Sequence, residues 1–245
     1  MYFLKKAYVS VISKVMWVSE RWFFYPKLAE AYLELLKVNK VEKIIILDIG
    51  AHKGESVKFF SSLYYKPIIY AFEPSKISFA ALKHAVHKIP DNEISIYQIG
   101  IGDQEILTDF FESILSETST FIQPNINSRY LKRKNRILLQ SHGNSFNSTT
   151  ARLTTVDAFV SENYIDRIDI MKIDVEGYEL QVLLGAEKTL REGKVRIIQF
   201  ERHADDMREN CFTEINAFLS SLHFKKVYEI KHFFGNFFDV IYEKD

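Results

Sequence analysis

Short runs of apolar, mostly β-branched residues alternate with helix-like stretches from Ile44 onward, and this alternation constrains the fold most. The first run, Ile44–Leu47, is continuously apolar, as expected of a strand that is buried on both faces of a parallel sheet. Similar runs cover residues 68–72 and 94–99, and a helix-like stretch precedes each of them. Because parallel neighbours need helical crossovers, this order predicts an α/β fold with a doubly wound sheet.

The same alternation resumes in the second half of the chain. The last two strand-like runs are separated by only a few residues, which is too short for a parallel crossover, so we expect them to be antiparallel. The predicted helices of this half are 156–163, 179–190 and 212–222, and the predicted strands are 168–173, 195–200, 224–230 and 236–242.

A chain of 245 residues suits one α/β domain with additions better than two full domains. We predict a helical extension over residues 1–40 and a domain over 41–245 with an insertion at about 105–152. Within the insertion, the pattern predicts a hairpin followed by a mobile loop, and this loop is either a functional lid or a solvated basic segment. Its parts are two strand-like pieces at 108–111 and 120–122, a basic piece at 129–136 and a polar piece at 141–150.

Residues 2–25 are aromatic and apolar, but no run approaches the roughly 20 apolar residues that span a bilayer. A small-residue cleavage site is absent, so the segment does not resemble a signal peptide. Two interpretations stay open: an amphipathic helix docked on the domain, or a helix that makes peripheral contact with a membrane. The charges that interrupt the segment are Lys5, Lys6, Lys14, Glu20 and Arg21.

The charge balance and the single cysteine exclude several classes of protein. Lys plus Arg and Asp plus Glu both total 32, which argues against a protein that works mainly by neutralising nucleic-acid phosphates. Cys211 is the one cysteine, so neither an internal disulfide nor a multi-cysteine metal site can form. The simplest compartment for such a chain is reducing and cytoplasmic.

The turn Asp48-Ile49-Gly50-Ala51-His52-Lys53-Gly54 comes where the first strand ends and the first helix begins. Glycine there lets backbone approach a ligand, and this end of an open α/β sheet is where cofactors bind. The spacing matches neither the dinucleotide pattern G-x-G-x-x-G nor a P-loop. An acidic residue directly before the turn fits a zwitterionic amino-acid group better than a phosphate.

Two further acidic residues follow the next strands. Glu73 stands 23 residues after Gly50, before Pro74, where a carboxylate can accept both hydroxyls of a ribose. Gly102-Asp103 follows the third strand, where Asp103 can accept a hydrogen bond from an exocyclic amine of adenine. The alternatives are a surface Glu ahead of a helix and an ordinary turn Asp.

The run from Lys172 to Glu176 ends the strand expected beside the first. Strand alternation puts Lys172 and Asp174 on one side of the strand, and Glu176 continues this spacing into the loop. Charges near the end of a buried strand are costly unless they are paired or take part in function. Either they act at a reaction centre, with Asp174, Glu176 and His203 as candidate proton acceptors, or Lys172 makes a salt bridge to a Glu beneath the site. We predict no resident metal; the alternative is a divalent ion held by Asp174, Glu176, Glu201 and His203.

Together these motifs resemble the FkbM-type methyltransferase family over roughly residues 44–202. The resemblance implies a Rossmann-like class I methyltransferase fold, in which a seven-stranded sheet has its last strand antiparallel. It also implies S-adenosylmethionine as the methyl donor and a hydroxyl acceptor on a sugar, glycan or other natural product. The segments that carry it are the turn 48–54, Phe72-Glu73-Pro74, Thr155-Val156-Asp157, Lys172-Ile173-Asp174-Val175-Glu176-Gly177-Tyr178-Glu179 and Val182-Leu183-Leu184-Gly185-Ala186.

The resemblance also implies a role for each matched position. The turn 48–54 meets the methionine end of the cofactor, Glu73 and Pro74 the ribose, Gly102 and Asp103 the adenine, while Asp174 and Glu176 border the sulfonium and the acceptor. Acceptor choice is expected in residues 1–40 and 129–150, which lie outside the matched region. The rival functions are an inactive binding module, a nicotinamide-dependent reductase and a nucleic-acid methyltransferase that uses the basic piece.

Overall fold

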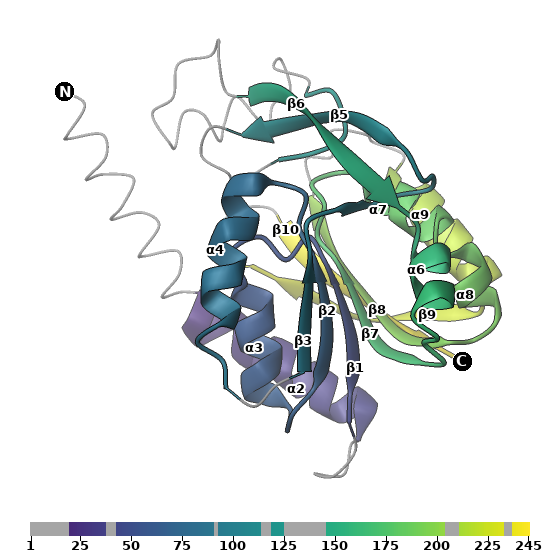
Figure 1. Cartoon of the computed structure of the whole chain (residues 1–245). Coiled ribbons are helices and arrows are strands. Elements are labelled where there is room, and N and C mark those ends of the chain that lie inside the picture. Colours follow the sequence, from purple (N-terminus) through teal and green to yellow (C-terminus); the bar gives the residue numbers. More distant parts are fainter. Residues whose placement is uncertain are drawn as a thin grey trace.

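A seven-stranded sheet forms the centre of the computed structural model (Figure 1). The structure describes residues 20–37, 43–90, 93–113, 119–124, 146–203, 211–232 and 237–245. The strand order is β3-β2-β1-β7-β8-β10-β9, and every neighbouring pair is parallel except the two that β10 makes. This confirms the predicted sheet. The strands are β1 Ile45–Ile49, β2 Ile68–Phe72, β3 Glu93–Tyr97, β7 Ile168–Ile173, β8 Val195–His203, β9 Phe224–Lys231 and β10 Phe237–Lys244.

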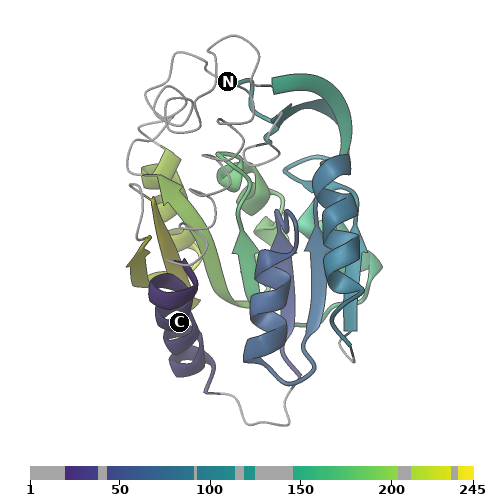
Figure 2. The ribbon, with the colours of Figure 1, turned by 90° about the vertical axis from the view of Figure 1, so that its left-hand side faces the viewer.

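Helices cover both faces of the sheet, with α2, α3 and α4 on one side and α6 to α9 on the other (Figures 1 and 2). Successive residues of a strand serve opposite faces: Ile46 packs in the cluster beneath α2 and α3, while Leu47 packs in the cluster beneath α6 and α7. The helices are η1 Glu20–Phe24 (a short π-helix), α2 Tyr25–Leu36, α3 Glu55–Leu63, α4 Lys76–Val86, α6 Val156–Glu162, α7 Glu179–Leu184, α8 Glu187–Arg191 and α9 Cys211–Ser221.

Helix α2 belongs to the core, although it lies within the predicted N-terminal extension. Leu28, Tyr32 and Leu36 are buried in the cluster that also holds strand residues. The Tyr32 hydroxyl donates to the side chain of Gln199 in β8, and Gln199 donates in turn to Asp239 in β10. The boundary at residue 40 stays a prediction, and residues 1–19 lie outside the described part.

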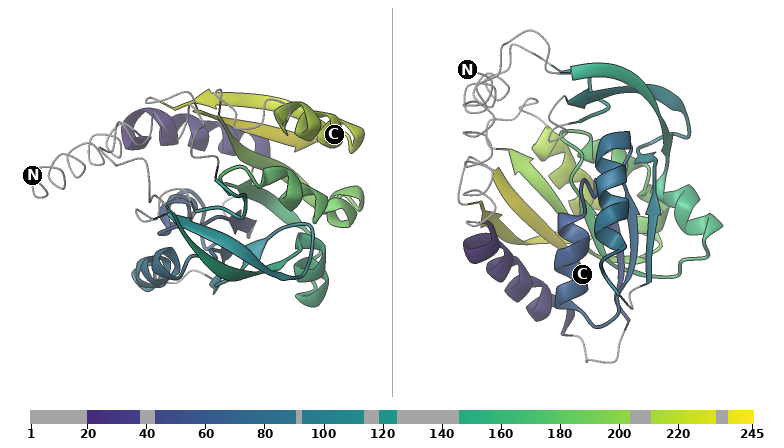
Figure 3. Two further views of the ribbon diagram at one scale, coloured as in Figure 1. Left: turned by 90° about the horizontal axis from the view of Figure 1, so that it is seen from above. Right: turned by 60° about the vertical axis from the view of Figure 1, so that its left-hand side comes forward.

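The predicted insertion forms a small second sheet above the carboxyl ends of the main strands. β5 Leu107–Ser113 pairs antiparallel with β6 Phe146–Thr154, and β6 also pairs with the short β4 Gly100–Ile101. Seen from above, β5 and β6 lie over the part of the sheet near α4, and β9 and β10 lie at the opposite side (Figure 3). The basic piece 129–136 lies outside the described residues.

Two predicted elements differ from the structure. The polar piece 141–150 was expected to be a mobile loop, but residues 146–150 belong to β6, because β5 supplies a complete antiparallel partner for them. The single helix expected over 179–190 is divided into α7 and α8 around Gly185. A Cβ at Gly185 would lie 1.9 Å from the carbonyl oxygen of Gly102, and Asp157 accepts hydrogen bonds from the first turn of α8. Long-range contacts therefore end α7 early.

Among the described residues, no helix is both long and apolar enough to cross a membrane.

Candidate functional site

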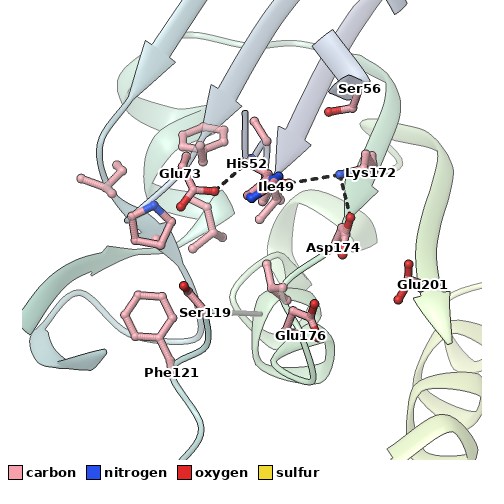
Figure 4. A pocket seen from close by; sticks show the side chains of 18 of the residues that line it. Ile49, His52, Ser56, Glu73, Ser119, Phe121, Lys172, Asp174, Glu176 and Glu201 are labelled. Carbon is pink, nitrogen blue, oxygen red and sulfur yellow. Dashed lines mark hydrogen bonds and ion pairs between the residues drawn. The ribbon is translucent and has the colours of Figure 1, made fainter. Parts of the chain in front are cut away.

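A cavity of about 320 Å³ opens at the carboxyl ends of β1, β2, β7 and β8, beneath β5 (Figure 4). This volume is at the lower end of the range for small-molecule sites. Its position is the edge where open α/β sheets bind ligands. The lining residues are Tyr25, Ile49, Gly50, Ala51, His52, Glu55, Ser56, Phe72, Glu73, Pro74, Ile99, Gly100, Ile101, Phe110, Ser119, Phe121, Lys172, Asp174, Val175, Glu176 and Glu201.

The turn after β1 passes directly over the end of β7. Gly50 has φ +83°, and a Cβ there would lie 1.8 Å from the carbonyl oxygen of Asp174. The N–H groups of Gly50 and Ala51 both donate to the carbonyl oxygen of Phe72, at 3.0 Å each. Glycine at position 50 is therefore required by the crossing of β7, and this crossing brings the turn and Asp174 together at the cavity.

Lys172 connects this turn to the residues at the end of β7. Its side chain is only 11% exposed, and its Nζ lies 3.2 Å from Asp48 Oδ1, 3.4 Å from Asp174 Oδ2 and 3.2 Å from the Gly50 carbonyl oxygen. Burial alone would lower the pKa of Lys172, but the charges of Asp48 and Asp174 outweigh it and raise the pKa well above its usual value. The alternative interpretation predicted a salt bridge from Lys172 to a Glu. The salt bridge is present, but its partners are Asp48 and Asp174.

Asp48 lies beneath the turn and does not appear among the lining residues. Its side chain is fully buried, and besides Lys172 it accepts a hydrogen bond from the Ser56 hydroxyl at the start of α3. Both oxygens are therefore used within the protein. The contact with the methionine end of the cofactor, which the sequence predicts for Asp48, stays a prediction.

Glu73 reaches the cavity from the end of β2. The residue is 6% exposed, and its carboxylate accepts the N–H groups of His52 at 2.9 Å and Ser75 at 2.8 Å. Burial raises the pKa of Glu73 to about 7, although these hydrogen bonds and the charge of His52 act in the opposite direction. A buried carboxylate with free lone pairs towards a cavity suits a ligand that offers hydroxyl groups.

His52 and Glu55 form an ion pair beside Glu73. The distance from His52 Nδ1 to Glu55 Oε2 is 3.5 Å. Burial alone would lower the pKa of His52, but the hydrogen bond and the charge of Glu55 outweigh it and raise that pKa above its usual value. Burial alone would raise the pKa of Glu55, but the hydrogen bond and the charge of His52 outweigh burial and lower that pKa to about 2.

Three carboxylates, from Asp174, Glu176 and Glu201, border the other half of the cavity (Figure 4). Glu176 has φ +52°, a left-handed conformation that is uncommon for a residue with a side chain. The Thr120 hydroxyl donates to the Glu176 carbonyl oxygen at 3.0 Å, so the insertion contacts the loop that presents Glu176. The acidic half therefore combines residues from β7, β8 and the insertion.

The remaining predicted site residues divide into two groups. Ala51, His52, Pro74 and Glu176 line the cavity with Gly50, Glu73 and Asp174, whereas Gly54, Gly102 and Asp103 do not appear in its lining. A Cβ at Gly54 would lie 3.1 Å from Leu82 and 3.2 Å from Ala85, so this glycine lets α3 approach α4. The adenine role of Gly102 and Asp103 stays a prediction.

His203 is the last residue of β8, where its backbone is opposite Phe237. Its side chain lies outside the described part of the structure, so its role as a proton acceptor stays a prediction. Within the described ranges, no group of three His, Cys, Asp or Glu residues is arranged to hold a metal ion.

Several lining residues were missed from the sequence. Phe110 and Phe121 cover the cavity from the insertion, with ring centroids 4.8 Å apart, and Tyr25 enters it from the start of α2. Ile99 could have been found, because it follows a parallel strand at the same edge as Glu73. Tyr25, Phe110 and Phe121 carry no local signal, because only long-range packing brings them to the cavity.

We predict that Lys172→Met lowers the free energy of unfolding by about 3–5 kcal/mol, because it leaves the buried Asp48 carboxylate without its counter-charge. Adding Asp48→Asn removes that charge, so the double variant should regain much of the loss. Urea titration measures both. The control Lys188→Met removes an ammonium that is 72% exposed and should change stability little. Equal stability of Lys172→Met and the unmodified protein would contradict the proposed pairing.

Glu73 should make stability depend on pH. Because the folded pKa of about 7 exceeds the ordinary value of 4.5, the folded protein holds the Glu73 proton more tightly than the unfolded chain. The contribution is fully present below pH 4.5 and is lost as the pH rises through about 7. Unfolding titrations should show that the free energy of unfolding decreases less from pH 5 to pH 8 for Glu73→Gln than for the unmodified protein. The control Glu214→Gln changes an exposed residue and should show the same decrease in the free energy of unfolding as the unmodified protein. The same decrease in Glu73→Gln would contradict the raised pKa of Glu73.

Comparison with known proteins identifies the family. Residues 48–226 match the family described as the methyltransferase FkbM domain. The 2-O-methyltransferase NoeI of Sinorhizobium fredii is 24% identical over 165 residues, which cover 67% of this chain and 65% of NoeI. The chain spans less than two thirds of each curated relative it matches.

Solved structures share the fold. A Streptococcus mutans protein described as a methyltransferase, in complex with SAH, has a TM-score of 0.51 and 11% identity, covering 89% of this chain and 97% of its own. An rRNA methylase from Streptococcus thermophilus has a TM-score of 0.50 and 13% identity, and the match covers 89% of this chain and 94% of the methylase. The predicted class I methyltransferase fold is thereby confirmed. The match over most of the sequence shows that this chain belongs to the FkbM methyltransferase family, with S-adenosylmethionine as its cofactor.

Proposed function

We propose that this protein transfers a methyl group from S-adenosylmethionine to a hydroxyl group of a sugar, glycan or related natural product. The observation that carries the proposal is the division of one cavity into two halves. The side chains of Glu73 and His52 lie towards one side of the cavity, and those of Asp174, Glu176 and Glu201 lie towards the other (Figure 4). One half suits the cofactor and the other a hydroxylated acceptor.

The first half fits the cofactor on chemical grounds. Glu73 offers a buried carboxylate to ribose hydroxyls, and Gly50 and Ala51 bring backbone to the cavity at the end of β1. Ile99 and Phe121 supply apolar surface for a flat base. S-adenosylmethionine supplies a methyl group on a positively charged sulfonium, and the carboxylates around the cavity complement that charge.

The second half favours a hydroxylated acceptor over a phosphorylated one. Asp174, Glu176 and Glu201 border it, and the ammonium of Lys172 is already shared between two carboxylates. Carboxylates accept hydrogen bonds from hydroxyl groups but repel phosphate. A nucleic-acid acceptor would bring phosphates close to this acidic surface, so it is the weaker candidate.

Methyl transfer to a hydroxyl requires a group that accepts the proton. We assign this task to Glu176, whose loop the Thr120 hydrogen bond connects to the insertion. Asp174 pairs with Lys172 and is assigned a positioning task, because this pair fixes the end of β7 against the turn. His203 is the second candidate for the proton acceptor. Holding cofactor and acceptor in line provides much of the acceleration in such a displacement.

The comparisons support the oxygen acceptor at a coarse level. The relative NoeI is named a 2-O-methyltransferase, at 24% identity. The likeness to an rRNA methylase concerns the fold alone. We place the reaction in a reducing, cytoplasmic compartment, because the chain has one cysteine.

Binding of S-adenosylhomocysteine tests the cofactor half. By calorimetry, the unmodified protein should bind it, and Glu73→Ala should bind about 10–100-fold more weakly, because two hydrogen bonds to a charged group are lost. Glu73→Gln keeps one hydrogen-bond acceptor and should lose less affinity for S-adenosylhomocysteine than Glu73→Ala. Glu192→Ala, on the surface of the domain, is the matched control and should bind normally. Failure of the unmodified protein to bind would contradict the enzyme and the inactive binding module alike.

Incubation with labelled S-adenosylmethionine and fractionated host extract tests the acceptor half. Label should enter polysaccharide, lipid-linked sugar or small hydroxylated products, and Glu176→Gln should lower the rate by about 10²–10⁴-fold while leaving S-adenosylhomocysteine binding intact. Label in RNA would overturn the proposed acceptor. Cofactor binding without label in any fraction would favour an inactive binding module.

A further inference from the structure

The insertion contacts the main domain on both sides of the cavity. Its described parts are β5 and residues 119–124 on one side of the gap, and β6 on the other. Phe111 in β5 and Thr120 form an antiparallel bridge, with N–O distances of 2.9 and 3.1 Å. β5 and residues 119–124 are therefore joined to each other, and each of them also makes its own contact with the main domain.

Glu112 attaches β5 to the residue that supports Glu73. Its carboxylate accepts a hydrogen bond from the hydroxyl of Ser75, which is 1% exposed and caps α4. The same hydroxyl accepts the Ser78 N–H at 3.2 Å, and the Ser75 N–H donates to Glu73 at 2.8 Å. Because a serine hydroxyl has a single proton, Glu112 fixes the direction of that hydroxyl. Ser75 in turn orients the carboxylate of Glu73.

Thr120 attaches residues 119–124 to the loop that presents Glu176. Thr120 is 4% exposed, and its hydroxyl donates to the Glu176 carbonyl oxygen at 3.0 Å and accepts the Ile122 N–H at 3.2 Å. A residue with a side chain keeps a left-handed conformation, as Glu176 does at φ +52°, only where its surroundings hold it. Thr120 supplies such a restraint. A Cβ at Gly177 would lie 3.4 Å from the Ile122 side chain, so the two segments are also in apolar contact.

Phe121 connects these contacts to the cavity, which its side chain lines (Figure 4). Its ring centroid lies 4.8 Å from that of Phe110 in β5 and 5.6 Å from that of Tyr178. A Cβ at Gly100 in β4 would lie 2.5 Å from the Phe121 ring. The ring is therefore enclosed by three segments, and a displacement of the insertion would move a side chain in the cavity wall.

We propose that Glu112 and Thr120 are positioning residues for methyl transfer. The insertion uses them to hold Glu73, Phe121 and Glu176 in one fixed arrangement across the cavity. Neither Glu112 nor Thr120 lines the cavity, so both act through residues that do. The inference rests on the function proposed above, in which Glu73 binds the cofactor and Glu176 accepts the proton.

The alternative is that these contacts only stabilise the insertion. β5 pairs with β6 along its whole length, so the hairpin has backbone hydrogen bonds of its own. A contact that is only structural changes the free energy of unfolding. A positioning contact changes ligand affinity or reaction rate in protein that is still folded, and a conservative variant that keeps the hydrogen bond restores them.

Calorimetry with S-adenosylhomocysteine tests the Glu112 contact in the full chain. Glu112→Ala should bind about 3–10-fold more weakly, because the loss of one hydrogen bond loosens Ser75 and with it Glu73. Glu112→Gln keeps an acceptor for the Ser75 hydroxyl and should retain most of the affinity. The matched control Asp109→Ala removes an exposed carboxylate from the same strand and should bind like the unmodified protein.

A double variant tests whether Glu112 acts through Ser75. Ser75→Ala combined with Glu112→Ala should bind S-adenosylhomocysteine no more weakly than Ser75→Ala alone, because the two residues contribute through one contact. Additive losses of affinity would contradict this route.

The rate of methyl transfer tests the Thr120 contact. With labelled S-adenosylmethionine and the extract fraction that takes up label, Thr120→Val should react at least about tenfold more slowly, because Glu176 is no longer held in place. Its affinity for S-adenosylhomocysteine should stay unchanged, and Thr120→Ser, which keeps the hydroxyl, should restore the rate. Hydrogen exchange needs no acceptor: the amides of residues 176–178 should exchange faster in Thr120→Val than in Thr120→Ser.

Several results would overturn the proposal. These are unchanged affinity of folded Glu112→Ala, an equal loss in Asp109→Ala, or an unchanged rate and unchanged amide exchange in Thr120→Val. If the unmodified protein does not bind S-adenosylhomocysteine, the proposed function fails and this inference fails with it. If it binds and Glu112→Ala binds equally well, this inference alone fails.

Discussion

The buried ammonium of Lys172 is the interaction on which the site depends. It joins Asp48 beneath the turn, the Gly50 carbonyl within the turn and Asp174 at the cavity, so it connects the ends of β1 and β7. The buried charges of Lys172 and Asp48 would each be costly alone in the interior, and each is stabilised by the other. The pairing also explains why the turn after β1 has to cross β7 so closely that Gly50 cannot carry a side chain.

The residues that line the cavity have two structural origins. The half that we propose for the cofactor includes strand ends and the first turn of the main sheet. Other lining residues come from outside that framework: Tyr25 from α2, and Ser119 and Phe121 from the insertion. The insertion is held at two places, by Glu112 to Ser75 and by Thr120 to Glu176, so it is attached to both halves.

The two errors in the predicted elements are caused by contacts between residues far apart in the chain, which the sequence does not reveal. The helix expected over 179–190 has an unbroken apolar pattern, and its interruption comes from the close approach of Gly185 to Gly102 and from Asp157 at the start of α8. Residues 146–150 are polar and read as a loop, yet their backbone pairs with β5. The position of Asp48 beneath the turn was also not predicted, because its partner Lys172 lies 124 positions later in the chain; its contact with the cofactor stays a prediction.

The sequence by itself determined the sheet, because apolar runs and crossover helices are local patterns whose topology follows from general rules. It also predicted that Gly50, Glu73, Asp174 and Glu176 lie at one edge of the sheet, where all four line the cavity, since the ends of parallel strands meet there. Only the tertiary structure decided that Tyr25 enters the cavity, that Asp48 lies beneath it, and that Trp22 faces outward while Phe24 is buried. Those outcomes depend on contacts between residues far apart in the chain, which no window of neighbouring residues encodes.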